Sequence, residues 1–141
     1  MSSEKKILIS MDESNNIPSS FSVVLYKDIE TLEDESLDEL FLSNLLDSFK
    51  DSEIIGAFGE VFSKVSVRGK IHIQSIDIDQ FCLYFSSRIL EFDEKNILYS
   101  GQKNIQSMAV LLKIIDKHFP CQVLAKKYVN GYEYYLLLEK K

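Results

Sequence analysis

The sequence predicts an α/β fold in which a mostly parallel, three-layer sheet ends in an antiparallel hairpin. Short apolar strands alternate with helical patterns along most of the chain. The opening strand, residues 6–10, carries an unbroken Ile7-Leu8-Ile9 run, which is typical of a central parallel strand buried on both faces. Near the C-terminus, Asn130-Gly131 separates two apolar runs, and this dipeptide favours the tight turn of a β-hairpin.

The next segments are two short strands and a helix. The apolar pattern predicts strands over residues 22–26 and 37–42, joined by loops. Ser52 is suited to cap a helix whose apolar residues recur three and four apart: Ile54, Ile55, Phe58, Val61, Phe62 and Val65. Gly56 and Gly59 weaken this helix by ~1 kcal/mol each relative to alanine, so we expect them to permit close packing against a sheet.

The second half continues the alternation. Arg68-Gly69 is predicted to turn the chain into a strand over residues 70–76, with Ile71, Ile73 and Ile76 inward. Asp77 or Asp79 then opens a helix with Ile78, Phe81, Cys82, Phe85 and Ile89 at helical spacing. Residues 107–119 form an amphipathic helix on Met108, Leu111, Leu112, Ile115 and Phe119, ended by Pro120. Residues 122–129 and 132–139 are the hairpin strands.

Bulk composition limits the class of protein. At 141 residues and 45% hydrophobic content, residues 1–141 fit a single domain with one core. The net charge of −6 disfavours nucleic acid and anionic membranes as partners, and Lys126-Lys127 is expected to be a solvated strand edge. The apolar run near the N-terminus is too short for a secretory or membrane segment, so we expect a cytoplasmic protein. Its lysine, isoleucine and asparagine are typical of an AT-rich genome, for instance a viral one.

Common catalytic motifs do not occur. The sequence holds neither a Gly-x-Ser-x-Gly elbow nor a phosphate-binding glycine loop. Cys82 and Cys121 lack the paired spacing of a zinc site or disulfide framework, so both are expected to be buried thiols. His72 is expected to point away from Ile71 and Ile73 as a partly exposed side chain. His118 is expected to interact with a helix C-terminus, so a metal site is disfavoured.

Tyrosines crowd the terminal hairpin at alternating positions. These are Tyr128, Tyr132, Tyr134 and Tyr135. They favour either an aromatic strip for protein contact or a cover for the sheet against the helix of residues 107–119.

Several motifs, in matching order, resemble the class I S-adenosylmethionine-dependent methyltransferases. The run from Asp34 to Phe49 is similar to the acidic turn and fourth strand of that family. Residues 65–70, Ile76-Asp77-Ile78-Asp79 and Leu98-Tyr99-Ser100-Gly101-Gln102 resemble later motifs, and the final hairpin matches the family's last two strands. The resemblance covers about three quarters of the chain and implies a Rossmann-like methyltransferase sheet, truncated in its N-terminal half.

The departures from the family fall where the cofactor would bind. In the family a glycine after the first strand lets backbone N–H groups approach S-adenosylmethionine, whereas residues 10–20 here contain no glycine. One strand-helix unit with the ribose-binding acid is missing. Asp28 matches the acid near the adenine or is an ordinary strand-end aspartate. If the domain is active, the resemblance implies a cofactor site at Ser10, Asp12, Asp28 and Asn44.

Two hypotheses follow about function. The first is a degenerate, non-catalytic methyltransferase-like domain without cofactor, which acts through protein association as a homo-oligomer or beside an active partner subunit. The second is an active S-adenosylmethionine-dependent methyltransferase on a sugar or small metabolite. The glycine-free loop favours the first hypothesis, and the later motifs favour the second.

Overall fold

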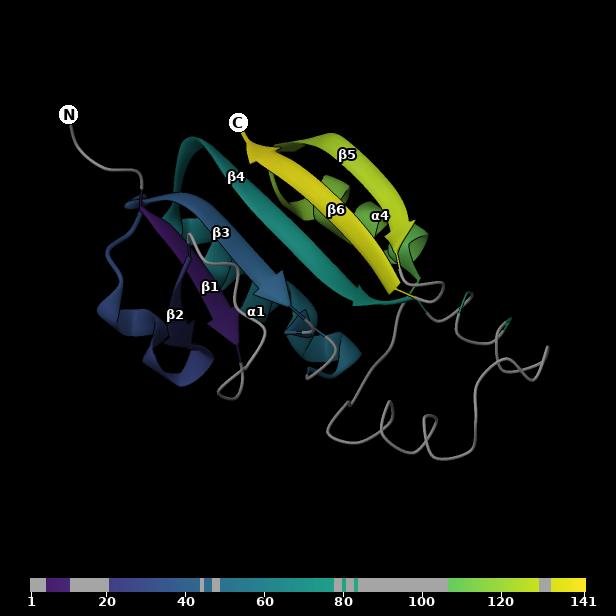
Figure 1. Ribbon diagram of the computed structural model, residues 1–141, viewed down its shortest axis with the longest axis horizontal. Helices are drawn as coiled ribbons and strands as arrows, with labels where there is room; N and C mark the ends of the chain where they lie inside the picture. The colour runs from purple at the N-terminus through teal and green to yellow at the C-terminus, as the bar shows by residue number, and fades with distance from the viewer. Residues whose placement is uncertain are drawn as a thin grey trace.

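The computed structural model describes residues 5–10, 21–43, 45–46, 49–77, 80, 83, 107–129 and 133–141. Its strands form one six-stranded sheet in the order β2-β1-β3-β4-β6-β5 (Figure 1). The parallel strands are β1 (Lys6–Ser10), β2 (Ser22–Leu25), β3 (Leu37–Ser43) and β4 (Val65–Ile76). β6 (Glu133–Lys140) is antiparallel to β4 and to β5 (Cys121–Val129). The predicted mostly parallel α/β sheet with a C-terminal hairpin is confirmed.

The core lies between this sheet and two helices. α1 (Asp51–Lys64) and α4 (Met108–His118) both lie behind the sheet in Figure 1. Alternate strand residues face the helices and are buried, among them Ile9, Leu42, Ile73 and Leu138. Each such side chain contributes roughly 2 kcal/mol through burial. We call this side of the sheet the helix face and the opposite side the front face.

The start of α1 differs from the prediction. The N-cap is Lys50 rather than Ser52, and Ser52 is an exposed residue inside the helix. The reason is the side chain of Glu53, whose Oε1 accepts the backbone N–H of Lys50 at 3.0 Å and so satisfies one of the free donors at this helix end.

The glycines of α1 do not pack against the sheet. Gly56 has nothing within 4 Å of the position that a Cβ would take, and Gly59 faces the ring of Phe119 at 3.6 Å. The predicted close approach is therefore wrong for Gly56, and at Gly59 the approaching group is a ring at the end of α4.

β4 begins five residues earlier than predicted. Its pairing with β3 jumps from Leu37↔Val65 to Glu39↔Lys70, so Arg68-Gly69 is a bulge inside the strand rather than a turn before it. Arg68 has a left-handed φ of 68°. A bulge accommodates extra residues in one strand without ending the ladder.

The end of β4 is linked to Gln80 and to the start of α4 by one buried carboxylate. Asp77 is fully buried, and its two oxygens accept the backbone N–H groups of Gln80 at 3.0 Å and Met108 at 2.8 Å. The first bond is the capping contact that the sequence predicted for Asp77. Ser107 caps α4 in the same way through Val110. Apart from Gln80 and Leu83, the helix predicted over residues 78–89, with Cys82, lies outside the described residues.

The N-terminal half is compressed. Eleven residues, 11–21, lead from β1 to β2, and eleven more, 26–36, lead from β2 to β3 and include the 3-10 helix η1 (Tyr26–Thr31). Crossovers between parallel strands ordinarily need a dozen or more residues. This agrees with the predicted truncation. None of the helices in the described part of the chain is long and apolar enough to cross a membrane.

Candidate functional site

The topology makes the carboxyl ends of β1 and β3 the place where a fold of this kind is expected to bind a small ligand. β1 pairs with β2 on one side and with β3 on the other, so the strand order reverses at β1. Open α/β sheets bind ligands outside the carboxyl ends of the strands at such a switch point. Ser10 ends β1 and Ser43 ends β3, so the expected site adjoins both.

The structure partly describes the four residues that the sequence indicated. The backbone of Ser10 pairs with Leu25 at the end of β2, three residues before Asp28. Asp28 is exposed in η1, where its carbonyl oxygen accepts the hydroxyl of Thr31 at 2.7 Å. Both residues therefore lie at the carboxyl edge of the sheet. Asp12 and Asn44 lie outside the described residues, so their predicted role stays a prediction.

Tyr26, the first residue after β2, is held by α1 and by the segment after β3. Its hydroxyl donates to Oε2 of Glu60 at 2.7 Å, and its ring meets that of Phe49 edge to face at 5.0 Å. Burial, and then the hydrogen bond to Glu60, raise the pKa of the Tyr26 phenol well above its usual range. This hydroxyl therefore stays protonated and fastens the carboxyl end of β2 to a helix.

Asp77 occupies the corresponding end of β4. Both of its carboxylate oxygens accept backbone N–H groups, from Gln80 and Met108. A carboxylate that accepts two such bonds and has no exposed surface holds the backbone segments that bond to it in place. Among the described polar groups of this edge, Tyr26 and Asp77 are therefore committed to internal contacts, whereas the Asp28 carboxylate faces solvent.

Among the described residues, a pocket lies at the end of the sheet opposite the switch point. It has a volume of about 280 Å³ at the amino end of β3 and around the bulge of β4. Its lining includes Asp38, Glu39, Arg68 and Lys70. The Asp38 carboxylate already accepts the backbone N–H of Lys5 at 2.7 Å. This pocket is far from the switch point, since it lies at the opposite ends of the same strands.

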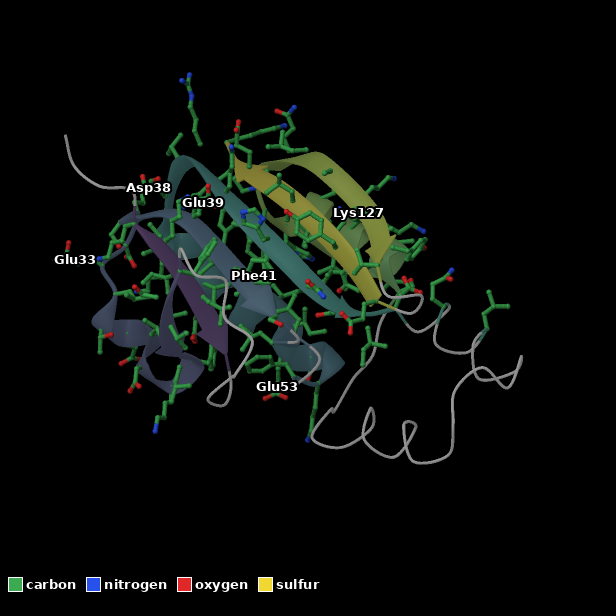
Figure 2. The ribbon with its side chains drawn as sticks, viewed as in Figure 1. Glu33, Asp38, Glu39, Phe41, Glu53 and Lys127 are labelled. Atoms are coloured by element: carbon green, nitrogen blue, oxygen red, sulfur yellow. The ribbon has the colours of Figure 1, made fainter. Side chains whose placement is uncertain are left out.

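The front face carries a hydrogen-bonded chain that crosses three strands. His72 on β4 lies between Glu39 on β3 and Tyr135 on β6, with Nε2 3.1 Å from Oε2 of Glu39 and Nδ1 2.6 Å from the Tyr135 hydroxyl. The imidazole also stacks on Phe41 at 5.6 Å and meets Phe21 edge to face. Figure 2 shows Glu39 and Phe41 over β3, and Lys127 over the hairpin.

The direction of hydrogen bonding along this chain follows from the groups that form it. A carboxylate only accepts, so Nε2–H of a neutral His72 donates to Glu39 and Nδ1 accepts from Tyr135. Burial, and then the charge of Glu39, raise the pKa of Tyr135. No group of three or more histidine, cysteine or acidic side chains suited to a metal occurs among the described residues.

Sequence reasoning found the face of His72 but missed its partners. The predicted direction, away from Ile71 and Ile73, is right, and the side chain is 17% exposed. The register between strands decides which residues His72 contacts. Phe41 lies directly opposite His72, and Tyr135 and Glu39 lie diagonally across from it on the neighbouring strands. Alternation places each of these side chains on one face, but it gives no register between strands.

The sequence predicts that the hairpin tyrosines either form an aromatic strip for protein contact or cover the sheet, and the structure contains both a buried and an exposed tyrosine here. Tyr134 is 2% exposed on the helix face, and Tyr128 is 50% exposed on β5. One therefore covers the core, and the other stands at the sheet edge, while Tyr132 lies outside the described residues. Cys121 is only half-buried rather than buried as predicted, because it begins the outermost strand.

Comparison with solved structures gives the fold a family name. A SAM-dependent methyltransferase of Thermotoga maritima is 16% identical over 100% of this chain and 84% of its own, with a TM-score of 0.64. One from Archaeoglobus fulgidus is 15% identical over 95% of this chain and 75% of its own, at 0.62. A Pyrococcus horikoshii protein is 16% identical over 97% of this chain and 72% of its own, with a TM-score of 0.65.

Neither a protein-family model nor a curated protein matches the sequence. The likeness in structure shows a common fold at these identities, and it confirms the resemblance drawn from the motifs. The chain therefore has the fold of the class I S-adenosylmethionine-dependent methyltransferases, shortened in its N-terminal half.

Proposed function

We propose that this chain is a methyltransferase-like domain that does not transfer methyl groups and acts by associating with protein, either further copies of itself or an active subunit. The observation that carries the proposal is the commitment of polar groups at the carboxyl edge. The Tyr26 hydroxyl is bonded to Glu60, and the two oxygens of Asp77 are bonded to the backbone N–H groups of Gln80 and Met108. These two groups are therefore unavailable to a cofactor at this edge, whereas the Asp28 carboxylate stays free.

The connection after β1 supports the same proposal. It contains no glycine, and eleven residues must carry the chain from Ser10 back to Ser22. A side chain at each position keeps the backbone N–H groups farther from an adenosyl ligand than glycine would. The residues of this edge therefore do not fit the cofactor cradle of the family.

Isothermal titration of the full chain with S-adenosylmethionine tests the proposal. We expect no heat of binding, and we expect the melting temperature to stay constant at saturating cofactor, because a ligand stabilises only a state that it binds. Binding in the micromolar range would defeat the proposal.

The second candidate is an active methyltransferase for a sugar or small metabolite. The exposed carboxylate of Asp28, next to the end of β2, favours it. In that case Asp28→Ala weakens cofactor binding without changing the melting temperature, and Glu30→Ala, an exposed neighbour in η1, leaves binding unchanged. If the wild type shows no binding, this candidate is eliminated.

A further inference from the structure

The charges of this acidic chain are concentrated at opposite ends of its sheet. Residues 27–39 contain seven carboxylates and one lysine, whereas residues 113–127 contain four lysines and one aspartate. The first segment follows β2, the outer strand at one end of the order, and the second ends in β5, the outer strand at the other. Glu33 and Lys127 lie at opposite sides of the sheet in Figure 2.

We call the first surface the acidic edge. It consists of exposed side chains in and after η1: Asp28, Glu30, Glu33, Asp34 and Glu35. Asp34 forms an ion pair with Lys64 at 2.9 Å. Within the described part of the chain, Glu30, Glu33 and Glu35 have no ion-pair partner. This edge therefore keeps most of its negative charge.

The second surface, the basic edge, combines lysines with exposed apolar side chains. Its charges are Lys126 and Lys127 on β5, with Lys113, Asp116 and Lys117 exposed on α4. On α4 the lysines continue a stripe that starts at Val110, at spacings of three and four, away from the buried Leu111 and Ile115. The apolar members are Val110, Val123, Leu124 and Tyr128, each more than 40% exposed.

The two edges do not neutralise each other within one copy. Six strands spaced by roughly 4.8 Å put the outer strands about 24 Å apart. The screening length is about 8 Å at physiological ionic strength, so the attraction between the edges is nearly lost over that distance. Each edge is therefore available to a second molecule.

The basic edge is unsuited to pairing with the same strand of a second copy. β5 is a long outer strand with a bulge between Val123 and Ala125 and two adjacent lysines. Bulges and edge lysines oppose the pairing of a strand with another copy of itself. The same lysines attract an acidic surface, so charge selects the acidic edge over a second β5.

Resting on the proposed function, we infer that copies of this chain associate head to tail, with the basic edge of one against the acidic edge of the next. Because the edges lie at opposite ends of the sheet, one contact leaves a free edge on each molecule. Such a heterologous contact continues beyond a dimer unless the rotation closes a ring. The apolar side chains of β5 add area that leaves water on contact.

Sedimentation velocity of the full chain at about 20 mM and about 0.5 M salt tests the inference, because the screening length changes severalfold over that range. The expected result is species larger than a dimer that grow with concentration at low salt, and monomer at high salt. A monomer at both salt concentrations, or association that salt does not change, would overturn the inference.

Charge-reversal variants test which surfaces meet. Lys126→Glu/Lys127→Glu and Glu33→Lys/Glu35→Lys should each be monomeric at low salt, and their equimolar mixture should associate again because each supplies one native edge. Lys50→Glu/Lys70→Glu, at exposed lysines outside both edges, is the matched control and should associate like the wild type. Circular dichroism verifies that each variant is folded.

Two outcomes separate this inference from the proposed function. Failure of the mixture to associate, or loss of association in the control, sinks the head-to-tail contact and leaves cofactor binding untouched. Binding of S-adenosylmethionine in the calorimeter sinks the proposed function, whatever the sedimentation shows. A monomer that is captured by an acidic second protein would also contradict self-association and would point to that partner.

Discussion

The hydroxyl oxygen of Tyr135 lies 2.6 Å from Nδ1 of His72, across the boundary between the parallel part of the sheet and its antiparallel hairpin. This contact joins residues 63 positions apart, and the other ring nitrogen of His72 continues the chain to Glu39 at 3.1 Å. The hairpin is therefore attached to the parallel strands through side chains on the front face, as well as through the backbone ladder and the core.

Removing the Tyr135 hydroxyl should weaken this attachment. We expect Tyr135→Phe to lower the free energy of unfolding by about 1 kcal/mol, the net value of one partly buried hydrogen bond. Urea denaturation gives the value, and a double-mutant cycle with His72→Ala should show a coupling of similar size. Additive effects of the two substitutions would mean that the hydroxyl does not bond to the imidazole.

Stability should fall at high pH because of Tyr26. Burial, followed by the hydrogen bond to Glu60, raises its pKa above the ordinary value of 10.0. Above about pH 10 the unfolded chain loses the phenolic proton while the folded chain keeps it, so stability is complete below pH 10 and declines as the pH rises. Tyr135 contributes with the same sign.

The measurement is urea denaturation of the wild type and Tyr26→Phe from pH 8 to 11. The variant should lose less stability than the wild type over the upper half of this range, because it has one fewer phenol to ionise on unfolding. Parallel curves for the two proteins would contradict the raised pKa.

Lys140 and Lys141 should respond differently to the same change. Nζ of Lys140 is buried and donates to the carbonyl oxygens of Val65 at 2.8 Å and Phe62 at 3.1 Å, over the Phe62 ring. Lys140→Met should lower the free energy of unfolding by about 2 kcal/mol, the scale of charged hydrogen bonds, because it leaves those carbonyls without their donor. Lys141→Met, at an exposed position, should have almost no effect. Equal effects in chemical denaturation would refute this role.

Two glycine-to-alanine substitutions should have opposite signs. A Cβ on Gly69 would lie 2.8 Å from the carbonyl oxygen of Ser66 and 3.1 Å from that of Leu37, so Gly69→Ala should destabilise by about 2 kcal/mol. Gly56 is exposed in α1 with open space around it, so Gly56→Ala should stabilise by about 1 kcal/mol. Thermal melts that move in the same direction would contradict this difference.

Local sequence determined much of the fold because its signals are short-range. The Ile7-Leu8-Ile9 run predicts β1, and the Asn130-Gly131 pair between two apolar runs predicts the hairpin strands β5 and β6. The structure contains all three strands. The stripe of α4 and its stop at Pro120 are correct to within one residue. Such features depend on neighbouring residues alone, so they can be recognised without knowledge of the tertiary contacts.

Two predicted boundaries failed because another contact outweighed the signal that had predicted them. Ser52 is a good capping residue, but the bond from the backbone N–H of Lys50 to the side chain of Glu53 starts α1 earlier. Arg68-Gly69 has turn composition, but pairing of Val65 with Leu37 carries β4 through it as a bulge. At α1 the competing bond joins residues only three apart, whereas at β4 the competing pairing joins residues far apart in the chain.

By itself, the sequence determined the type and order of these elements, the glycine-free connection after β1 and the separation of acidic from basic segments along the chain. Only the tertiary structure decided that those segments lie at opposite edges of one sheet, that Tyr26 and Asp77 are committed to internal bonds, and that His72 meets Tyr135. The reason is that local pattern depends on near neighbours, whereas strand order and register arise from the pairing of residues far apart in the chain.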